Sequence, residues 1–108
     1  MCQFQTLYVD GDNYVIFCIK CNCYQILFGN TLISLQEEDF ALLRHVVSVK
    51  YDESEYFPTA EHLRNITIPT PSDGVYILLT KHETSEFLNM LEQADNEKKA
   101  RSMLELFN

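Results

Sequence analysis

Hydrophobic and polar residues alternate along the first third of the chain. Between residues 4 and 9 every second side chain falls on a common face, as in a β-strand with one side towards a core. Residues 14–19 and 24–28 are rich in β-branched and aromatic side chains, and turn-forming residues occur at 10–13 and 29–30. The pattern therefore predicts consecutive antiparallel strands joined by tight turns, a β-meander.

A helix is expected to follow a short strand at residues 31–33. Ser34 and Glu37 have the spacing of a capping box, which predicts that the helix opens at Ser34. Apolar residues then recur at helical spacing, at Phe40, Leu43 and Val47. A β-branched run weakens the helix beyond His45, where a strand could begin. The acidic segment 51–61 is expected to be a surface loop.

The second half of the chain predicts two more strands and a final helix. The strands are expected at residues 64–68 and 75–80, and a turn-rich segment containing two prolines links them. Thr80 and Glu83 repeat the capping-box spacing and predict the start of the helix. The pair at residues 95–96 is expected to break or kink this helix.

These elements predict an α+β fold. We expect an antiparallel β-meander or sheet of about five to six strands, with two or three helices packed on one face. The 108 residues of the chain predict one domain that spans residues 1–108. A hydrophobic fraction of 46% is too high for a disordered chain and supplies the side chains for a core.

The net charge of the chain argues against some classes of binding partner. Sixteen acidic and eight basic residues give a net charge of −8, which argues against nucleic acid and against anionic membranes. Residues 1–10 carry no basic side chain, unlike a signal peptide, and no apolar run reaches the roughly 18 residues that a membrane span needs. We therefore expect a cytoplasmic protein whose thiols are kept reduced.

Strand geometry predicts that the four cysteines gather. In residues 14–19 and 24–28 the inward side chains are expected to be those of Val15, Phe17, Ile19, Tyr24, Ile26 and Phe28. A tight turn between these strands then places Cys18 and Cys23 together on the opposite face, with Cys21 at the tip. A four-residue loop at 10–13 gives the pairs Tyr8–Val15, Thr6–Phe17 and Phe4–Ile19. The same register brings Cys2 opposite Cys21.

This cluster has three interpretations. One is a metal site, most simply zinc, on Cys2, Cys18, Cys21 and Cys23, because zinc takes four soft ligands and a C-x2-C turn offers two of them. The second is a set of free thiols that act as small hydrophobic side chains. The third is a disulfide, for which Cys18 and Cys23 are the best pair. A second C-x2-C motif is missing, and apart from zinc we expect no cofactor.

Catalytic motifs are weak in this sequence. His45, His62 and His82 have no metal-binding spacing and are expected to be ordinary surface or interface histidines. The chain contains no nucleophile elbow, phosphate-binding loop or dinucleotide fingerprint. A cysteine–histidine nucleophile pair stays open as an alternative, because such partners meet in space rather than in sequence. The residues favour a protein that is not an enzyme.

The last helix carries more apolar residues than one sheet face needs. They are Phe87, Leu88, Met90, Leu91, Met103, Leu104, Leu106 and Phe107. Surplus apolar side chains on a surface usually mark a contact with a partner. We therefore expect a protein-interaction module whose partner is another protein or a second copy of the chain, with the zinc-binding module and the cysteine-dependent enzyme as alternatives.

One segment resembles a known family. Cys18 and Cys21 in C-x-x-C spacing, the sequence Phe28-Gly29-Asn30, and an acidic helix start before Phe40 are similar to a small uncharacterised bacterial family of short proteins, a domain of unknown function. The resemblance implies a free-standing intracellular domain and brings no activity. The site residues that it carries over are Cys18 and Cys21 alone.

Overall fold

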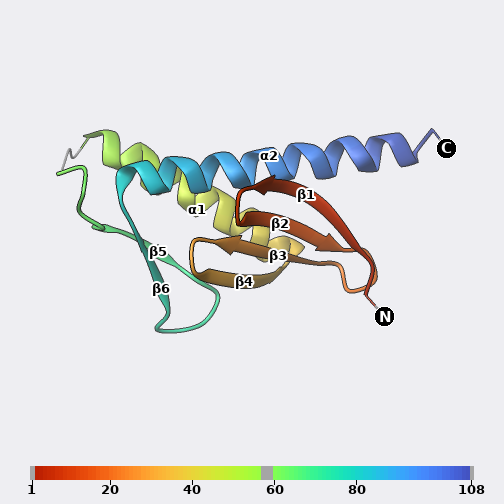
Figure 1. Ribbon diagram of the computed structural model, residues 1–108, viewed down its shortest axis with the longest axis horizontal. Coiled ribbons are helices and arrows are strands. Elements are labelled where there is room, and N and C mark those ends of the chain that lie inside the picture. Colours follow the sequence, from red (N-terminus) through yellow and green to blue (C-terminus); the bar gives the residue numbers. More distant parts are fainter. Residues whose placement is uncertain (1, 57–59, 108) are drawn as a thin grey trace.

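The N-terminal third forms the predicted meander. The computed structural model describes residues 2–56 and 60–107, and its first four elements are strands in consecutive order (Figure 1). They pair antiparallel as one sheet and are β1 (Phe4–Asp10), β2 (Asn13–Cys18), β3 (Cys23–Phe28) and β4 (Thr31–Gln36). Gly11 and Gly29 take positive φ angles of 61° and 62° in the turns after β1 and β3, a conformation that costs glycine little.

The rest of the described chain forms two helices and a short hairpin. Their bounds are α1 (Glu37–Tyr56), β5 (Ile66–Pro69), β6 (Tyr76–Leu79) and α2 (Lys81–Glu105). α1 packs against β3 and β4, α2 packs against β1 and β2, and the two helices contact each other. The fold is therefore α+β, with the helices on one face of the four-stranded sheet (Figure 1).

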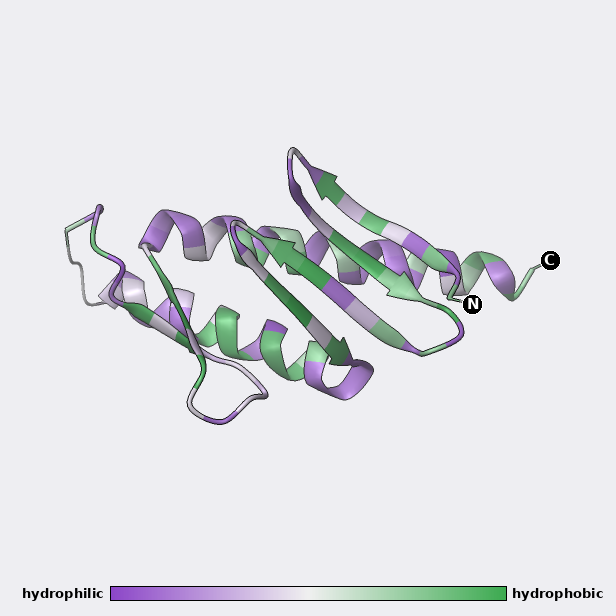
Figure 2. Ribbon diagram, turned by 60° about the horizontal axis from the view of Figure 1, so that its bottom comes forward, coloured by the Kyte–Doolittle hydropathy of each residue, from purple (hydrophilic) through white to green (hydrophobic). Residues whose placement is uncertain are grey.

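The core lies between that face and the helices. The inward side chains of β2 and β3 are buried as predicted at Val15, Phe17, Tyr24 and Ile26, and they meet buried residues of both helices. The Tyr24 and Phe40 rings stack with centroids 4.0 Å apart, which fixes the start of α1 under β3. Figure 2 shows hydrophobic residues along the strands and in the middle of α1, while the first turn of α1 is hydrophilic.

The sheet count differs from the prediction. β5 and β6 pair with each other as a separate two-stranded sheet, so the single sheet of five to six strands is wrong in its count. The hairpin packs on the helices, β5 against α1 and β6 against α2. Ile68 and Leu79 bury their side chains in the common core. Burial against helices, rather than pairing with β4, therefore positions this hairpin.

Both helices differ from their predicted limits. Ser34 does not cap α1, because it pairs with Gln25 inside β4, and the helix begins at Glu37 with three acidic residues in its first turn. α1 continues past His45 to Tyr56, since burial of Val47 outweighs the low helix propensity of β-branched residues. Residues 51–56 of the expected acidic loop are thus helical, and residues 57–59 lie outside the described residues.

α2 runs without interruption through residues 95–96. Asp95 accepts ion pairs from Arg44 on α1 at 3.6 Å and from Lys99 one turn later at 2.8 Å. These contacts hold the helical conformation where a break was expected. The capping box at Thr80 and Glu83 is confirmed, with both of its hydrogen bonds present.

The register of β1 contains an irregularity. Tyr8 pairs with Val15 as predicted, but Thr6 pairs with Ile16 and Phe4 with Cys18, because a β-bulge lies between Thr6 and Tyr8. The predicted Thr6–Phe17 and Phe4–Ile19 pairs are therefore wrong. The extra residue, Leu7, is buried in the core, and the Thr6 carbonyl beside it accepts a hydrogen bond from Arg101 of α2 at 2.9 Å.

Candidate metal centre

Three cysteines converge at the end of the sheet formed by the β2–β3 connection. The Sγ atoms of Cys2, Cys18 and Cys21 all lie within 4.8 Å of one another. The Cys2 and Cys21 sulfurs are 3.3 Å apart, within hydrogen-bonding distance. Cys2 and Cys21 are exposed, whereas Cys18 is 1% exposed. The arrangement is a small sulfur cluster with a buried base and an open rim.

The N-terminal segment reaches this cluster through the sheet. Phe4 pairs with Cys18, the last residue of β2, and the Ile19 N–H donates to the Gln3 carbonyl at 2.9 Å. These contacts extend the β1–β2 pairing beyond β2. Cys2 is thereby held next to the turn that carries Cys21, although 19 residues separate the two in sequence.

The turn after β2 is a compact reversal that aims Cys18 and Cys21 at the same point. The Asn22 N–H donates to the Cys18 carbonyl at 2.8 Å, and Asn22 takes a positive φ of 54°. Asparagine tolerates this left-handed conformation better than most residues other than glycine. Asn22 directly follows the C-x2-C spacing, and its residue type is the sequence signal for a left-handed residue in this turn.

Cys23 lies beside the cluster on the neighbouring strand. It pairs directly with Cys18 across the β2–β3 ladder and is half-buried. Burial, and then the nearby Cys21 and Cys18 groups, raise the pKa of the Cys23 thiol. The three-sulfur group does not include Cys23, but all four cysteines gather at one end of the sheet. Which of them bind a metal stays a prediction.

Hydrogen bonds distribute one negative charge within the cluster. Burial by itself raises the pKa of Cys18, but the Cys21 backbone N–H, the Cys2 and Cys21 thiols and the Gln3 backbone outweigh it and lower the pKa to about 6. Hydrogen bonds to Cys21 and Cys18, followed by burial, raise the pKa of Cys2 to about 12. These hydrogen bonds favour the thiolate form of Cys18, which is the form in which cysteine binds a metal ion.

The full sequence, residues 1–108, matches a family of unknown function, DUF6686. The chain belongs to DUF6686. This confirms the predicted resemblance to an uncharacterised family and extends it from a short segment to the whole chain. No curated protein and no solved structure matches this DUF6686 chain.

The histidines of the DUF6686 chain do not join the cysteines. Among the residues that the structure describes, the cluster contains sulfur ligands only, with no histidine or carboxylate. His82 lies at the start of α2 and pairs with Glu86 at 2.8 Å, and His45 is an exposed residue of α1. A cysteine–histidine nucleophile pair therefore has no support at this cluster.

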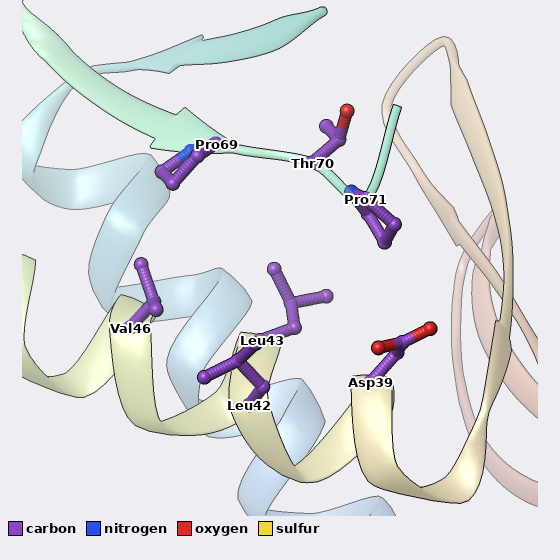
Figure 3. A pocket seen from close by; sticks show the side chains of 7 residues that line it. All are labelled: Asp39, Leu42, Leu43, Val46, Pro69, Thr70 and Pro71. Atoms are coloured by element: carbon purple, nitrogen blue, oxygen red, sulfur yellow. The ribbon is translucent and has the colours of Figure 1, made fainter. Parts of the chain in front are cut away.

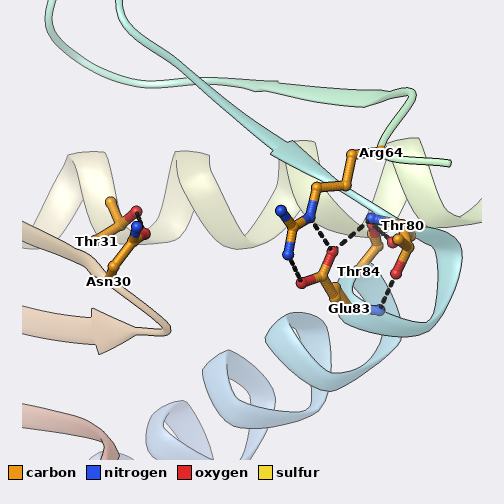
Figure 4. A network of polar contacts seen from close by, with 6 residues as sticks. All are labelled: Asn30, Thr31, Arg64, Thr80, Glu83 and Thr84. Carbon is orange, nitrogen blue, oxygen red and sulfur yellow. Dashed lines mark hydrogen bonds and ion pairs between the residues drawn. The ribbon is translucent and has the colours of Figure 1, made fainter. Parts of the chain in front are cut away.

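A network of polar side chains caps the N-terminus of α2 in the DUF6686 chain. Arg64 donates two hydrogen bonds to the carboxylate of Glu83, both at 3.2 Å (Figure 4). Glu83 and Thr80 exchange the capping-box bonds at 2.9 and 3.0 Å, and the Thr84 hydroxyl donates to the Thr80 carbonyl at 2.8 Å. These contacts pair the Glu83 carboxylate and the hydroxyls of Thr80 and Thr84 within the network, which holds the first turn of α2 in place.

The cavity between α1 and the end of β5 is small and apolar. It has a volume of about 120 Å³. Leu43 and Val46 of α1 point towards the segment with Pro69 and Pro71, whereas the Thr70 side chain points away from the helix (Figure 3). The residues that line the cavity are Asp39, Leu42, Leu43, Val46, Pro69, Thr70 and Pro71. Ligand pockets typically occupy roughly 300–1,000 Å³ with converging polar groups, and this cavity has neither property.

No helix in the described ranges is long and apolar enough to cross a lipid bilayer. The longest, α2, has 25 residues, but charged side chains recur along its whole length. The expectation from hydropathy is confirmed to this extent.

Proposed function

We propose that this DUF6686 chain is a structural zinc-binding module whose ligands are the thiolates of Cys2, Cys18, Cys21 and Cys23. The observation that carries the proposal is the convergence of three Sγ atoms within 4.8 Å of one another. In a tetrahedral site with zinc–sulfur bonds of about 2.3 Å, the sulfurs are about 3.8 Å apart. The three sulfurs therefore need only small movements to surround an ion.

Cys23 is the proposed fourth ligand. It stands directly opposite Cys18 in the ladder, and the Cβ atoms of such a pair are about 4.5–5.5 Å apart. We expect a change of the Cys23 side-chain rotamer to bring its sulfur towards the other three. Burial and its thiol neighbours disfavour the Cys23 thiolate in the metal-free chain. A bound divalent cation reverses this preference, because it stabilises the deprotonated ligand.

The donor set favours zinc over the common hard cations. Magnesium and calcium prefer oxygen ligands, and no carboxylate belongs to the described cluster. Thiolates suit zinc, and a site closed by four sulfurs is typical of structural rather than catalytic zinc. In this chain the ion would fasten the N-terminal segment to the β2–β3 turn.

The first experiment measures metal in protein purified without chelator. We expect about one zinc per chain by elemental analysis, and cobalt substitution should give the intense thiolate-to-metal charge-transfer band of a sulfur-rich tetrahedral site. Cys23→Ser should weaken the cobalt band, whereas Gln25→Ser, two residues along the same strand, should preserve it. Zinc below about a tenth of an equivalent in protein with reduced thiols would refute the proposal.

We propose self-association of the chain as a second function. At the end of α2, four apolar side chains are exposed, with Leu106 at 81% and Phe107 at 83%. Glu105 is the only charged residue between positions 103 and 107, so a partner can cover this stretch at little desolvation cost. The proposed occupant is the same stretch of a second copy, because a two-fold contact is self-complementary.

Light scattering over a range of protein concentrations tests this second function. Leu104→Glu combined with Phe107→Glu should convert a dimer to a monomer, while Val9→Glu, an equally exposed apolar position on β1, should leave the dimer intact. A monomeric wild-type chain at all accessible concentrations would reject self-association. It would leave the zinc proposal untouched.

A further inference from the structure

The two exposed cysteines of the cluster are placed for a second chemistry. The Cys2 and Cys21 sulfurs are 3.3 Å apart, and a disulfide bond of about 2.05 Å requires them to close by little more than 1 Å. Cys2 precedes β1 and Cys21 lies in the β2–β3 connection, so neither residue is itself paired in the ladder. Both side chains are exposed and accessible to an oxidant.

We infer that Cys2 and Cys21 form a reversible disulfide and that this bond controls whether the site holds its metal. The inference rests on the proposed zinc function and names its regulation. The oxidant class is a small-molecule disulfide such as oxidised glutathione. The device is local, because it uses only the open rim of the cluster.

The reaction balances without any further component. The sulfur of Cys21, as a thiolate, attacks one sulfur of the oxidised glutathione, forms a mixed disulfide and expels one glutathione thiolate. The second cysteine then attacks the protein sulfur of the mixed disulfide, forms the Cys2–Cys21 bond and expels the other glutathione. The two protons lost by the protein thiols end on the two glutathione molecules, so the protein is oxidised by two electrons and glutathione disulfide is reduced.

The structure favours this pair over Cys18 and Cys23. Cys18 is 1% exposed, so an external disulfide has little access to its sulfur. Cys18 and Cys23 also end and begin paired strands, and the ladder fixes their backbone separation. Cys2 and Cys21 can adjust both backbone and side chain. Exposed disulfides of this kind are generally the ones that cells can reduce again.

Bond formation removes two of the four proposed ligands. Cys18 and Cys23 then remain as the only thiols, and two sulfurs cannot complete a tetrahedral zinc site. Bound zinc should in turn protect the thiols, because each ligand sulfur shares its electron pair with the ion. Metal occupancy and disulfide formation are therefore mutually exclusive states of one cluster.

The experiment titrates the zinc-loaded full-length chain with mixtures of reduced and oxidised glutathione. Free thiols, chain mass, zinc content and the disulfide-linked peptides are measured at each ratio. We expect the thiol count to fall from four to two, a Cys2–Cys21 peptide pair to appear, and protein-bound zinc to fall about tenfold in step. Reduction should restore both thiols and zinc binding.

Variants separate the inference from the zinc proposal. Cys21→Ser should form no disulfide within the chain, and any glutathione adduct on Cys2 shows in the chain mass, whereas Lys20→Ser, a neighbouring control, should behave as wild type. If the chain binds zinc but forms another pair, or no disulfide, the inference fails and the zinc function stands. If Cys2–Cys21 forms in a chain that never binds zinc, the zinc function fails, and the regulation that rests on it fails with it.

Discussion

The two ends of the molecule are stabilised by different chemistry. At the start of α2, Arg64 pairs with Glu83 and Lys81 pairs with Glu55 at 3.1 Å, so cations and carboxylates neutralise one another. At the opposite end, near the N-terminus, the cluster of Cys2, Cys18 and Cys21 contains only sulfur (Figure 1).

The two ends differ in whether their polar groups already have partners within the protein. The network at Thr80 and Glu83 satisfies its own donors and acceptors, so an added ligand has no unmet group to bind. The sulfur cluster has a lowered Cys18 pKa, and three sulfurs that can each bind a metal ion converge there. This convergence is why we propose the function at this end.

The largest expected effect comes from removal of the buried sulfur of Cys18. We expect Cys18→Ser to weaken zinc binding by at least 100-fold, about 2.7 kcal/mol, because a neutral hydroxyl replaces the pre-formed thiolate. Competition with a chromophoric chelator measures the affinity. In wild type a chelator should lower the melting temperature, and in Cys18→Ser it should have no effect. Unchanged zinc affinity would place the ion elsewhere.

The turn conformation offers the next largest effect. Asn22→Val forces a β-branched residue into a φ of 54° and should lower the free energy of unfolding by about 1–2 kcal/mol. Zinc affinity should fall as well, since the turn aims Cys18 and Cys21. Asn22→Gly is the matched control, because glycine adopts this conformation freely and should keep both properties near wild type. Urea unfolding with and without zinc provides the measurement.

The opposite end should respond to a cap mutation without any effect on metal. Thr80→Ala removes the side-chain half of the capping box and should cost about 1 kcal/mol of stability. Zinc affinity should stay at the wild-type value, because the cap and the cluster lie at different ends. Thr80→Ser retains the hydroxyl and serves as the control. A parallel loss of zinc binding would show that the two ends are coupled.

The smallest expected effect is the contribution of the Glu83 carboxylate to stability, which acid removes. Arg64, then the Thr80 backbone N–H, lower the pKa of Glu83 below its ordinary value of 4.5. The folded state therefore gains stability from this carboxylate above pH 4.5, and loses that gain as the pH falls through the lowered value. Because Arg64 is largely exposed, the contribution should stay below about 1 kcal/mol.

Urea unfolding of wild type and Glu83→Gln at two pH values tests this sign. The difference in stability between the two proteins should be largest near neutral pH and should vanish in strong acid. A difference that grows on acidification would contradict the assignment of the carboxylate as the charged partner.

Local sequence signals predicted the meander and the gathering of the cysteines. Turn residues at Gly11 and Gly29 fixed strand order, and side-chain alternation placed Cys18 and Cys23 on the face away from the helices. These features depend on residues that are close in sequence, so a local pattern is enough to predict them. The capping box at Thr80 is another such case.

The features that sequence reasoning missed depend on distant contacts. The continuation of α2 past Asp95 rests on Arg44 of α1, and the position of the β5–β6 hairpin rests on burial of Ile68 against the helices. The lowered pKa of Cys18 arises from hydrogen bonds to Cys21, Cys2 and Gln3, which meet only in the folded chain. No periodicity in a single segment reports such contacts.

The β-bulge at Leu7 determines on which face of the sheet the side chains that precede it lie. Side chains alternate along a strand, so one additional residue inverts the orientation of everything that precedes it. With Leu7 present, Phe4 stands opposite Cys18 and shares its side of the sheet. A regular ladder in which Leu7 paired with Ile16 would instead place Phe4 opposite Ile19, on the other face of the sheet from Cys18. The β-bulge at Leu7 thus sets which face of the sheet the residues before it occupy, although it lies several residues from the nearest cysteine.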